Sequence, residues 1–297
     1  MDNLLQDINK TKDIFFWTMF QKIDMNDVNI NLLIDNINKV NSNYFKVISN
    51  TTETLADPFL LKYNDQMYVF FEKINNTRWN TRLGEGTGEI YSSKLTSIDG
   101  VLSYSEPELA LSINSHLSYP FLIKENDIIY MIPEQRKTGR LDLYKCLEFP
   151  NRWENVKTLL TGNFSDSTLF YYNNIYWLFT IQSDRKNIEY KENLYYSSTL
   201  LNEEWKFHST IKITNKKSSR RGAGNIFVKN NKIYRPVQNN KVYYGQGILM
   251  LEIKKLTECE YQETLVGEIG RNIHTINILD DWIVLDSNNN NKNFFIL

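Results

Sequence analysis

DPFLLKYNDQMYVFFE, residues 57–72, is an apolar run, a short polar break and a second apolar run. The pattern returns as YPFLIKENDIIYMIPE at 119–134, DSTLFYYNNIYWLFTIQ at 166–182, AGNIFVKNNKIYRPVQ at 223–238 and, more loosely, HTINILDDWIVLDSN at 274–288. Two apolar runs around a break of Asn, Asp, Lys or Glu predict a β-hairpin. A hairpin repeated at intervals of roughly 50 to 60 residues predicts stacked blades or solenoid units.

Further strand candidates lie between the hairpins. They are GEIYSSKL at 88–95, DLYKCLEF at 142–149, NLYYSSTLL at 193–201 and GILMLEIKKL at 247–256. A hairpin with one or two outer strands makes a blade, so five copies predict an all-β fold, a five-bladed β-propeller. The last copy has too few strands of its own, and YFKVI at 44–48 is expected to supply its outer strand and close the ring.

The N-terminal region has a different pattern. IFFWTMF at 14–20 and VNINLLIDNI at 28–37 have helix-like apolar spacing. We therefore expect a short helical N-terminal extension over residues 1–43, followed by the five-bladed propeller over residues 44–297.

Composition excludes several classes of function. The formal net charge of −1 among 297 residues gives no reason to expect a nucleic-acid partner. No apolar run is long enough to span a bilayer, and the N-terminus lacks the pattern of a signal peptide, so we expect a cytoplasmic protein without a membrane span. Two cysteines provide neither a disulfide framework nor metal-ligand spacing, and no cofactor is expected.

The two ends of each hairpin lie at one edge of its sheet, so the repeats in register predict a shared rim. The first residues are Asp57, Tyr119, Asp166, Ala223 and His274, and the returning ends are Glu72, Glu134, Gln182 and Gln238. For any single position a hydrophilic strand end is an equally good explanation, but the whole set is mostly acids, amides and a histidine. Carboxylates at one mouth shift one another's pKa, which lets one act as acid and another as base.

Basic and aromatic residues flank these positions. His116 precedes the second repeat, Arg221 precedes the fourth, and Arg235 lies within it. Arginine beside a carboxylate cluster balances charge or binds an anionic substrate group. Tyr119 and Tyr244 are candidates for stacking on sugar faces.

Several phrases in order resemble a known family. They are ADPFL (56–60), HLSYPF (116–121), MIPE (131–134), the Asp166 segment, SRRGAGN (219–225), Arg235 with Gln238, YYGQGI (243–248), LEIKKLT and HTIN (274–277). Together they look like the N-terminal β-propeller of glucosamine inositolphosphorylceramide transferases and their bacterial relatives, over residues 50 to 290 or so. In the plant-type enzymes sugar transfer is attributed to a separate C-terminal glycosyltransferase domain, so the resemblance implies the fold and an association with carbohydrate, not that reaction.

The arrangement is more distantly similar to the five-bladed propellers of family 43 glycoside hydrolases. In that family an Asp of a first-blade Asp-Pro motif, a second Asp and a Glu form the catalytic group. Asp57 and Pro58 match the motif, whereas Asp166 is followed by Ser167 instead of proline. By this resemblance Asp57 would be the base or nucleophile, Glu134 the proton donor, and Asp166 the residue that orients substrate or tunes Glu134.

Two hypotheses of function follow. In the first, which we favour, the chain is a carbohydrate-active enzyme of surface-glycan metabolism, a glycosidase or glycosyltransferase that uses two carboxylates flanking the scissile bond. In the second, the mouth only binds a sugar, nucleotide sugar or glycan, and a partner glycosyltransferase performs the chemistry. Under both, the expected substrate-binding residues are Glu72, His116, Tyr119, Arg221, Arg235, Gln238, Tyr244 and His274. No metal is assigned, although His116 and His274 with the acids form an alternative divalent-ion site.

Overall fold

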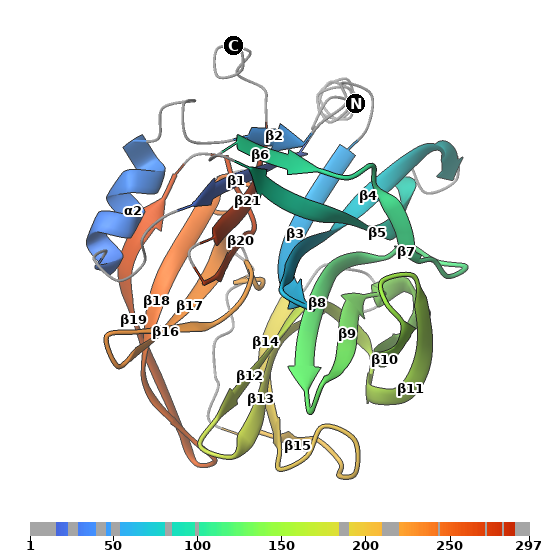
Figure 1. Cartoon of the computed structure of the whole chain (residues 1–297). Helices are drawn as coiled ribbons and strands as arrows, with labels where there is room; N and C mark the ends of the chain where they lie inside the picture. The colour runs from blue at the N-terminus through green and yellow to red at the C-terminus, as the bar shows by residue number, and fades with distance from the viewer. Residues whose placement is uncertain are drawn as a thin grey trace, which may run out of the picture.

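The computed structural model describes residues 16–22, 29–39, 46–48, 54–80, 85–98, 101–183, 190–209, 220–242, 244–270, 272–280 and 282–288. Their strands form five antiparallel sheets (Figure 1).

The first three long repeats each build one sheet. The first sheet contains β3 (Thr54–Tyr63), β4 (Gln66–Asn80), β5 (Glu85–Ile98), β6 (Val101–Tyr104) and β7 (Glu108–Leu111). The second contains β8 (Ser118–Glu125), β9 (Ile128–Glu134), β10 (Arg140–Glu148) and β11 (Arg152–Thr161), with the short 3-10 helix η2 (Arg136–Thr138) between β9 and β10. The third contains β12 (Asn163–Tyr172), β13 (Ile175–Ser183), β14 (Tyr190–Ser197) and β15 (Lys206–Phe207).

The fourth and fifth sheets follow the same order. The fourth contains β16 (Phe227–Lys229), β17 (Lys232–Asn239), β18 (Gly247–Thr257) and β19 (Glu260–Ile269). The fifth joins the two ends of the chain, with β20 (Ile276–Leu279), β21 (Trp282–Asn288), β1 (Phe16–Lys22) and β2 (Lys46–Ile48). Helix α2 (Ile30–Lys39) completes the described elements.

The polar breaks of the first four repeats are tight turns. Both central residues have positive φ in Asn64–Asp65, Asn126–Asp127, Asn173–Asn174 and Asn230–Asn231. Two consecutive left-handed residues are the requirement of a type I′ hairpin, and Asn and Asp tolerate that conformation best after glycine. The hairpins predicted from sequence are confirmed.

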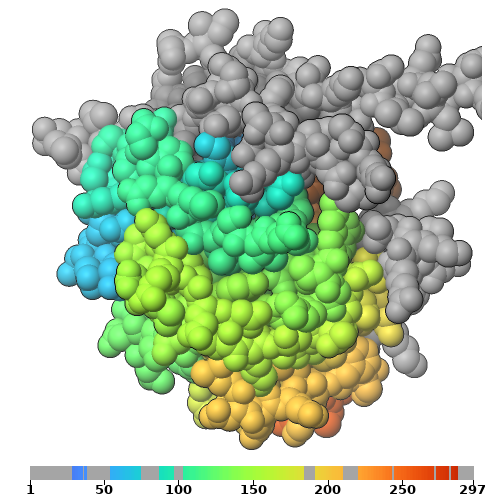
Figure 2. Space-filling model, turned by 90° about the vertical axis from the view of Figure 1, so that its right-hand side faces the viewer, coloured from blue at the N-terminus to red at the C-terminus, as the bar shows by residue number. Residues whose placement is uncertain are grey.

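The first strand of each hairpin lies toward the centre. β3 contacts β8, β8 contacts β12, and β3 contacts β20, so successive sheets radiate from one axis as in a propeller. Apolar side chains fill the space between sheets. One buried cluster joins Phe59 of β3, Phe121 of β8 and Leu178 of β13. Figure 2 shows the side of the molecule on which the second and third sheets, green to yellow-green, form the surface.

The fifth sheet corrects the N-terminal prediction. The helix expected over IFFWTMF is wrong, because Phe16–Lys22 is strand β1 and pairs along its whole length with β21. Pairing with a distant strand satisfies backbone groups that local spacing does not reveal. YFKVI does supply the outermost strand, because β2 pairs with β1. The rest of residues 1–43, apart from Asn29 and α2, lies outside the described residues.

Helix α2 is the part of the helical extension that the structure contains. Its residues Leu33, Ile34 and Ile37 are buried in a cluster with Met250 and Ile269 of the fourth sheet. The helix therefore covers the outer strands of that sheet, as Figure 1 shows at β19. Among the described residues no helix is long and apolar enough to cross a membrane.

Gly224 lies where the chain before the fourth sheet approaches β20, and a substitution there tests this packing. Its φ is +118°, and an added Cβ would lie 1.8 Å from the carbonyl oxygen of Ile276. We expect Gly224→Ala to lower the free energy of unfolding by about 3 kcal/mol or more, because the backbone of β20 would have to move. Urea unfolding measures the effect.

Gly139→Ala is the matched control. Gly139 also has positive φ, but an added Cβ would meet no atom within 4 Å. Gly139→Ala should lower the free energy of unfolding only by the cost of placing alanine in the left-handed conformation, about 1–2 kcal/mol. Equal losses in the two variants would contradict the close approach.

Candidate active site at the propeller mouth

Three repeats begin with a strained residue at the same structural position. Asp57, Tyr119 and Asp166 have φ values of 51°, 46° and 43°. The pairing register with the second hairpin strand shifts at each of these residues, so each is part of a β-bulge. Left-handed backbone in residues other than glycine, repeated at one place in three sheets, is typical of a functional site.

A carboxylate from the preceding sheet binds the backbone N–H of each strained residue. Asp57 donates to Asp286 Oδ2 at 3.0 Å, Tyr119 donates to Asp57 Oδ2 at 3.1 Å, and Asp166 donates to Glu134 Oε2 at 3.1 Å. The fifth sheet is thereby joined to the first, the first to the second, and the second to the third. Among the predicted rim residues, the bulges bring Asp57, Glu134 and Asp166 to the junctions between neighbouring sheets.

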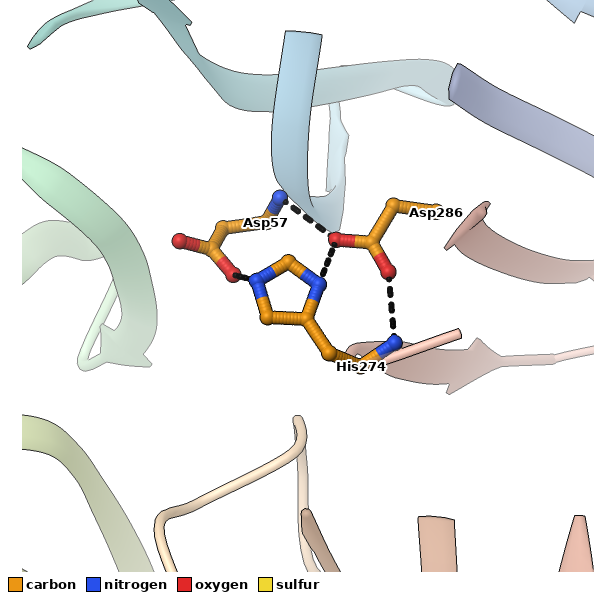
Figure 3. A group of neighbouring side chains, drawn as sticks. All are labelled: Asp57, His274 and Asp286. Atoms are coloured by element: carbon orange, nitrogen blue, oxygen red, sulfur yellow. Dashed lines mark hydrogen bonds and ion pairs between the residues drawn. The ribbon is translucent and has the colours of Figure 1, made fainter. Parts of the chain in front are cut away.

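Asp57, His274 and Asp286 form a triad (Figure 3). His274 Nδ1 lies 2.6 Å from Asp286 Oδ2, and His274 Nε2 lies 3.3 Å from Asp57 Oδ1. Asp286 also accepts the backbone N–H groups of His274 and Thr275, and Thr275 Oγ1 donates to Asp57 Oδ1 at 2.7 Å. The imidazole is held between two carboxylates, and all three side chains are buried.

The triad favours a charged imidazole. Burial alone would lower the pKa of His274, but Asp286 and Asp57 outweigh burial and raise that pKa to about 9. Burial raises the pKa of Asp57 to about 6; His274 acts to lower it, and Asp166 and Asp286 act to raise it.

Among the described residues, the triad is a group whose ligand atoms lie close enough together to hold a metal ion. One ligand atom from each of its three side chains lies within 4.8 Å of the other two. The same oxygens already accept hydrogen bonds from Tyr119, Thr275 and the backbone. These side chains therefore suit a protonated imidazole better than a metal ion, and we assign no metal.

Glu134 and Asp166 share one guanidinium. Arg221 Nε and Nη2 donate to the two oxygens of Asp166 at 2.5 and 3.0 Å, and Nη2 also donates to Glu134 Oε2 at 3.1 Å. Gln238 Nε2 donates to Asp166 Oδ2 at 2.8 Å. Burial raises the pKa of Asp166 to about 7; Arg221 opposes this and Glu134 adds to it.

Glu72 lies beside this pair, at the returning end of the first hairpin. Its Oε1 is 3.2 Å from His116 Nε2. Burial raises the pKa of Glu72 well above its usual range, the charges of Asp57, Glu134 and Asp166 add to the increase, and Arg221 opposes it. Glu72 therefore interacts electrostatically with Asp57, Glu134, Asp166 and Arg221. We call the following residues the mouth cluster: Asp57, Glu72, Glu134, Asp166, Arg221, Gln238, His274 and Asp286.

The two predicted tyrosines have different surroundings. Tyr119 is fully buried, and its hydroxyl bonds Thr168 Oγ1 at 2.8 Å and accepts the N–H of Gly224 at 2.7 Å. It is thus part of the core beneath the mouth. Tyr244 is 42% exposed, and its ring lies over Arg221 and edge-on to His274.

Arg235 belongs to a separate network. It is buried and forms ion pairs with Glu192 at 2.6 Å and Glu263 at 2.9 Å, and Arg220 binds Glu263 at 2.6 Å. Neither Glu192 nor Glu263 is a member of the mouth cluster. Arg235 lies on β17 within the fourth repeat, and its ion pairs join it to β14 and β19.

Asp286 is the member of the mouth cluster that sequence reasoning missed. The fifth hairpin is shorter than the others, so counting fifteen or sixteen residues from His274 passes beyond it. In the structure Asp286 lies on the second strand of the fifth hairpin and donates its N–H to Thr275 O. Alignment on hairpin pairing instead of length would have found it.

The fold and the buried carboxylates at its centre define the class of protein, a β-propeller with an acidic mouth. Solved structures with this fold include a GH32 β-fructofuranosidase from Bombyx mori, 16% identical with a TM-score of 0.53, covering 75% of this chain and 53% of that one. A GH43 β-xylosidase/α-arabinofuranosidase from a compost microbial metagenome is 12% identical with a TM-score of 0.52, covering 79% and 86%. At these identities the likeness shows the fold alone.

The family is shown by sequence. Residues 38–275 match the family described as glucosamine inositolphosphorylceramide transferase 1, N-terminal, and the chain belongs to this family. The transferase 1 of Arabidopsis thaliana is 35% identical over 218 residues, 71% of this chain and 27% of the relative. The enzyme of Oryza sativa subsp. japonica is 33% identical over 217 residues, 72% and 28%. The chain thus spans little more than a quarter of these curated relatives, and the resemblance seen in its motifs is confirmed.

The raised pKa of Asp166 predicts a pH-dependent stability. A carboxyl whose pKa is raised to about 7 in the folded chain, above an unfolded value of about 3.9, binds more protons when folded, so its contribution to stability falls as pH rises between the two. Asp166→Asn removes this titration. We expect the free energy of unfolding of the variant, relative to wild type, to improve by a few kcal/mol from about pH 4 to pH 7.

Urea midpoints at several pH values measure the difference. Asp65→Asn is the control, because Asp65 is an exposed hairpin-turn residue. A wild-type advantage that grows with pH would contradict the assignment.

Proposed function

We propose that the mouth cluster is a carbohydrate-active centre at which a glycosyl unit is cleaved or transferred. The observation that carries the proposal is a group of buried carboxyl groups at one mouth with different tendencies to hold a proton. Family membership supports a carbohydrate substrate, because the relatives are named glucosamine inositolphosphorylceramide transferases. We also propose that the five sheets are five blades of one ring.

Asp57 suits the role of base or nucleophile. Thr275 and the N–H of Tyr119 each bind one of its oxygens, which fixes the orientation of the carboxylate. Its pKa of about 6 leaves it mostly ionised at neutral pH, and the neighbouring imidazolium of His274 stabilises that charge.

Glu134 suits the role of proton donor less well. Its recorded partners, Arg221 and the N–H of Asp166, are both donors, and donors stabilise a carboxylate anion. We therefore give Glu134 the role of holding Arg221 and the Asp166 bulge in place.

A second function is favoured by one observation. Arg221 forms ion pairs with both Glu134 and Asp166, an arrangement that gives a rigid polar floor and leaves less free carboxylate for chemistry. Such a floor with Tyr244 beside it would bind a sugar or nucleotide sugar for a partner glycosyltransferase.

An activity screen separates the two functions. Wild type, Asp57→Asn and Glu134→Gln are assayed on activated glycosides and nucleotide sugars. For an enzyme we expect Asp57→Asn to lower turnover by a factor of 100 or more, because the base or nucleophile is lost. Glu134→Gln should lower it less. Sugar binding by calorimetry without turnover in any protein would favour the binding function.

Tyr244 should contribute stacking energy under either function. A tyrosine ring against a sugar face is worth about 0.5–1.5 kcal/mol, taking the range for aromatic contacts, so Tyr244→Ala should weaken sugar binding by a factor of about 2 to 13. Val242→Ala is the control, since Val242 is 76% exposed in the same loop. Equal affinities of the two variants would contradict a stacking role.

A further inference from the structure

Glu72 differs from the other acids of the mouth cluster in its partners. Asp57 has an imidazolium beside it, and Glu134 and Asp166 bind a guanidinium. The recorded side-chain partner of Glu72 is His116, and its own side chain is 8% exposed.

The backbone of Gly88 fixes the tautomer of His116. The Gly88 N–H donates to His116 Nδ1 at 2.9 Å, so Nδ1 carries a lone pair. A neutral imidazole then has its proton on Nε2, the atom that faces Glu72 at 3.2 Å. A neutral His116 therefore turns its Nε2–H toward Glu72, although Glu72 Oε1 accepts no hydrogen bond from the described residues.

Gly88 also provides the space for this pair. A Cβ at residue 88 would lie 2.5 Å from Glu72 Oε1 and 2.8 Å from His116 Cε1. The absence of a side chain there lets the carboxyl and the imidazole meet at the mouth.

Resting on the function proposed above, we propose that Glu72 is the proton donor of the mouth and that His116 is its positioning residue. The geometry selects Glu72 because its buried Oε1 accepts no hydrogen bond from the described residues, whereas a guanidinium or an imidazolium holds the other acids. The groups facing Glu72 are Asp57, Glu134, Asp166, Arg221 and His116. Burial and the three carboxyl groups raise the pKa of Glu72 well above its usual range, and Arg221 opposes them.

The proposed step needs only the glycoside and one water molecule. The O–H bond of Glu72 breaks, and its proton passes to the leaving-group oxygen as the C1–O bond of the glycoside breaks with its electron pair on that oxygen. A new bond forms at C1 from water, which gives its proton to Asp57, or from Asp57 itself, with water completing hydrolysis afterwards.

The protonation of Glu72 is measured directly by NMR of protein labelled with ¹³C at the glutamate side-chain carboxyl, with the Glu72 signal assigned by its loss in Glu72→Gln. We expect this signal to remain that of the acid at neutral pH. His116→Phe removes the Nε2–H donor and should raise the pKa of Glu72 further, and His116→Gln, which keeps a donor, should restore it toward wild type. A Glu72 signal that titrates in the ordinary glutamate range overturns the proposal.

Leaving-group dependence tests the role in turnover. Glu72→Gln should lower turnover by a factor of 100 or more on glycosides with an alkyl alcohol leaving group, and much less on aryl glycosides whose leaving group needs no proton. Asp57→Asn should affect both substrates alike. Glu89→Gln is the matched control, because Glu89 is a buried glutamate on β5 that bonds Ser112.

The outcomes separate the two proposals. Wild-type turnover that Glu72→Gln leaves unchanged, or lowers equally on both substrates, overturns the proton-donor role alone. Absence of turnover by wild type on every glycoside overturns the enzymatic function and this role with it.

Discussion

The structure depends on hydrogen bonds from a strained backbone N–H in one sheet to a carboxylate in the preceding sheet. They join Asp57 to Asp286, Tyr119 to Asp57, and Asp166 to Glu134. Each N–H is buried and outside the regular ladder, so leaving one unpaired would cost about 1–3 kcal/mol. The bonds that hold the sheets together at the centre are therefore made by the same side chains that form the mouth, and fold and site cannot vary independently.

This constraint concentrates charge in a small volume. The mouth cluster has five carboxyl groups, Asp57, Glu72, Glu134, Asp166 and Asp286, and two cationic groups, Arg221 and His274. Two cations cannot neutralise five buried carboxylates, so protons must neutralise part of the remainder. The raised pKa values of Asp57, Glu72 and Asp166 have this common origin. Chemistry that needs a carboxylic acid at neutral pH is a consequence of how the sheets are joined.

Local patterns in the sequence were sufficient for the hairpins, because Asn and Asp pairs specify type I′ turns without any distant contact. The rim residues followed from the same register. Features that depend on pairing between distant segments could not be predicted from the sequence. Strand β1 forms by pairing with β21, more than 250 residues away. Asp286 was hidden by a shortened hairpin, and Tyr119 has a rim position yet a side chain in the core.

The adjacent arginines show why position in a motif does not determine which network a side chain joins. Arg221 binds Glu134 and Asp166 at the mouth, whereas Arg220 binds Glu263. Glu263 also binds Arg235 of the same sheet, and Arg235 binds Glu192 of the third sheet. The backbone of Arg220 and Arg221 is therefore held by Glu263 on one side and by Glu134 and Asp166 on the other. Since the position of Arg221 decides how much of the mouth's negative charge is neutralised, ion pairs outside the mouth help set the protonation of the carboxyl groups within it.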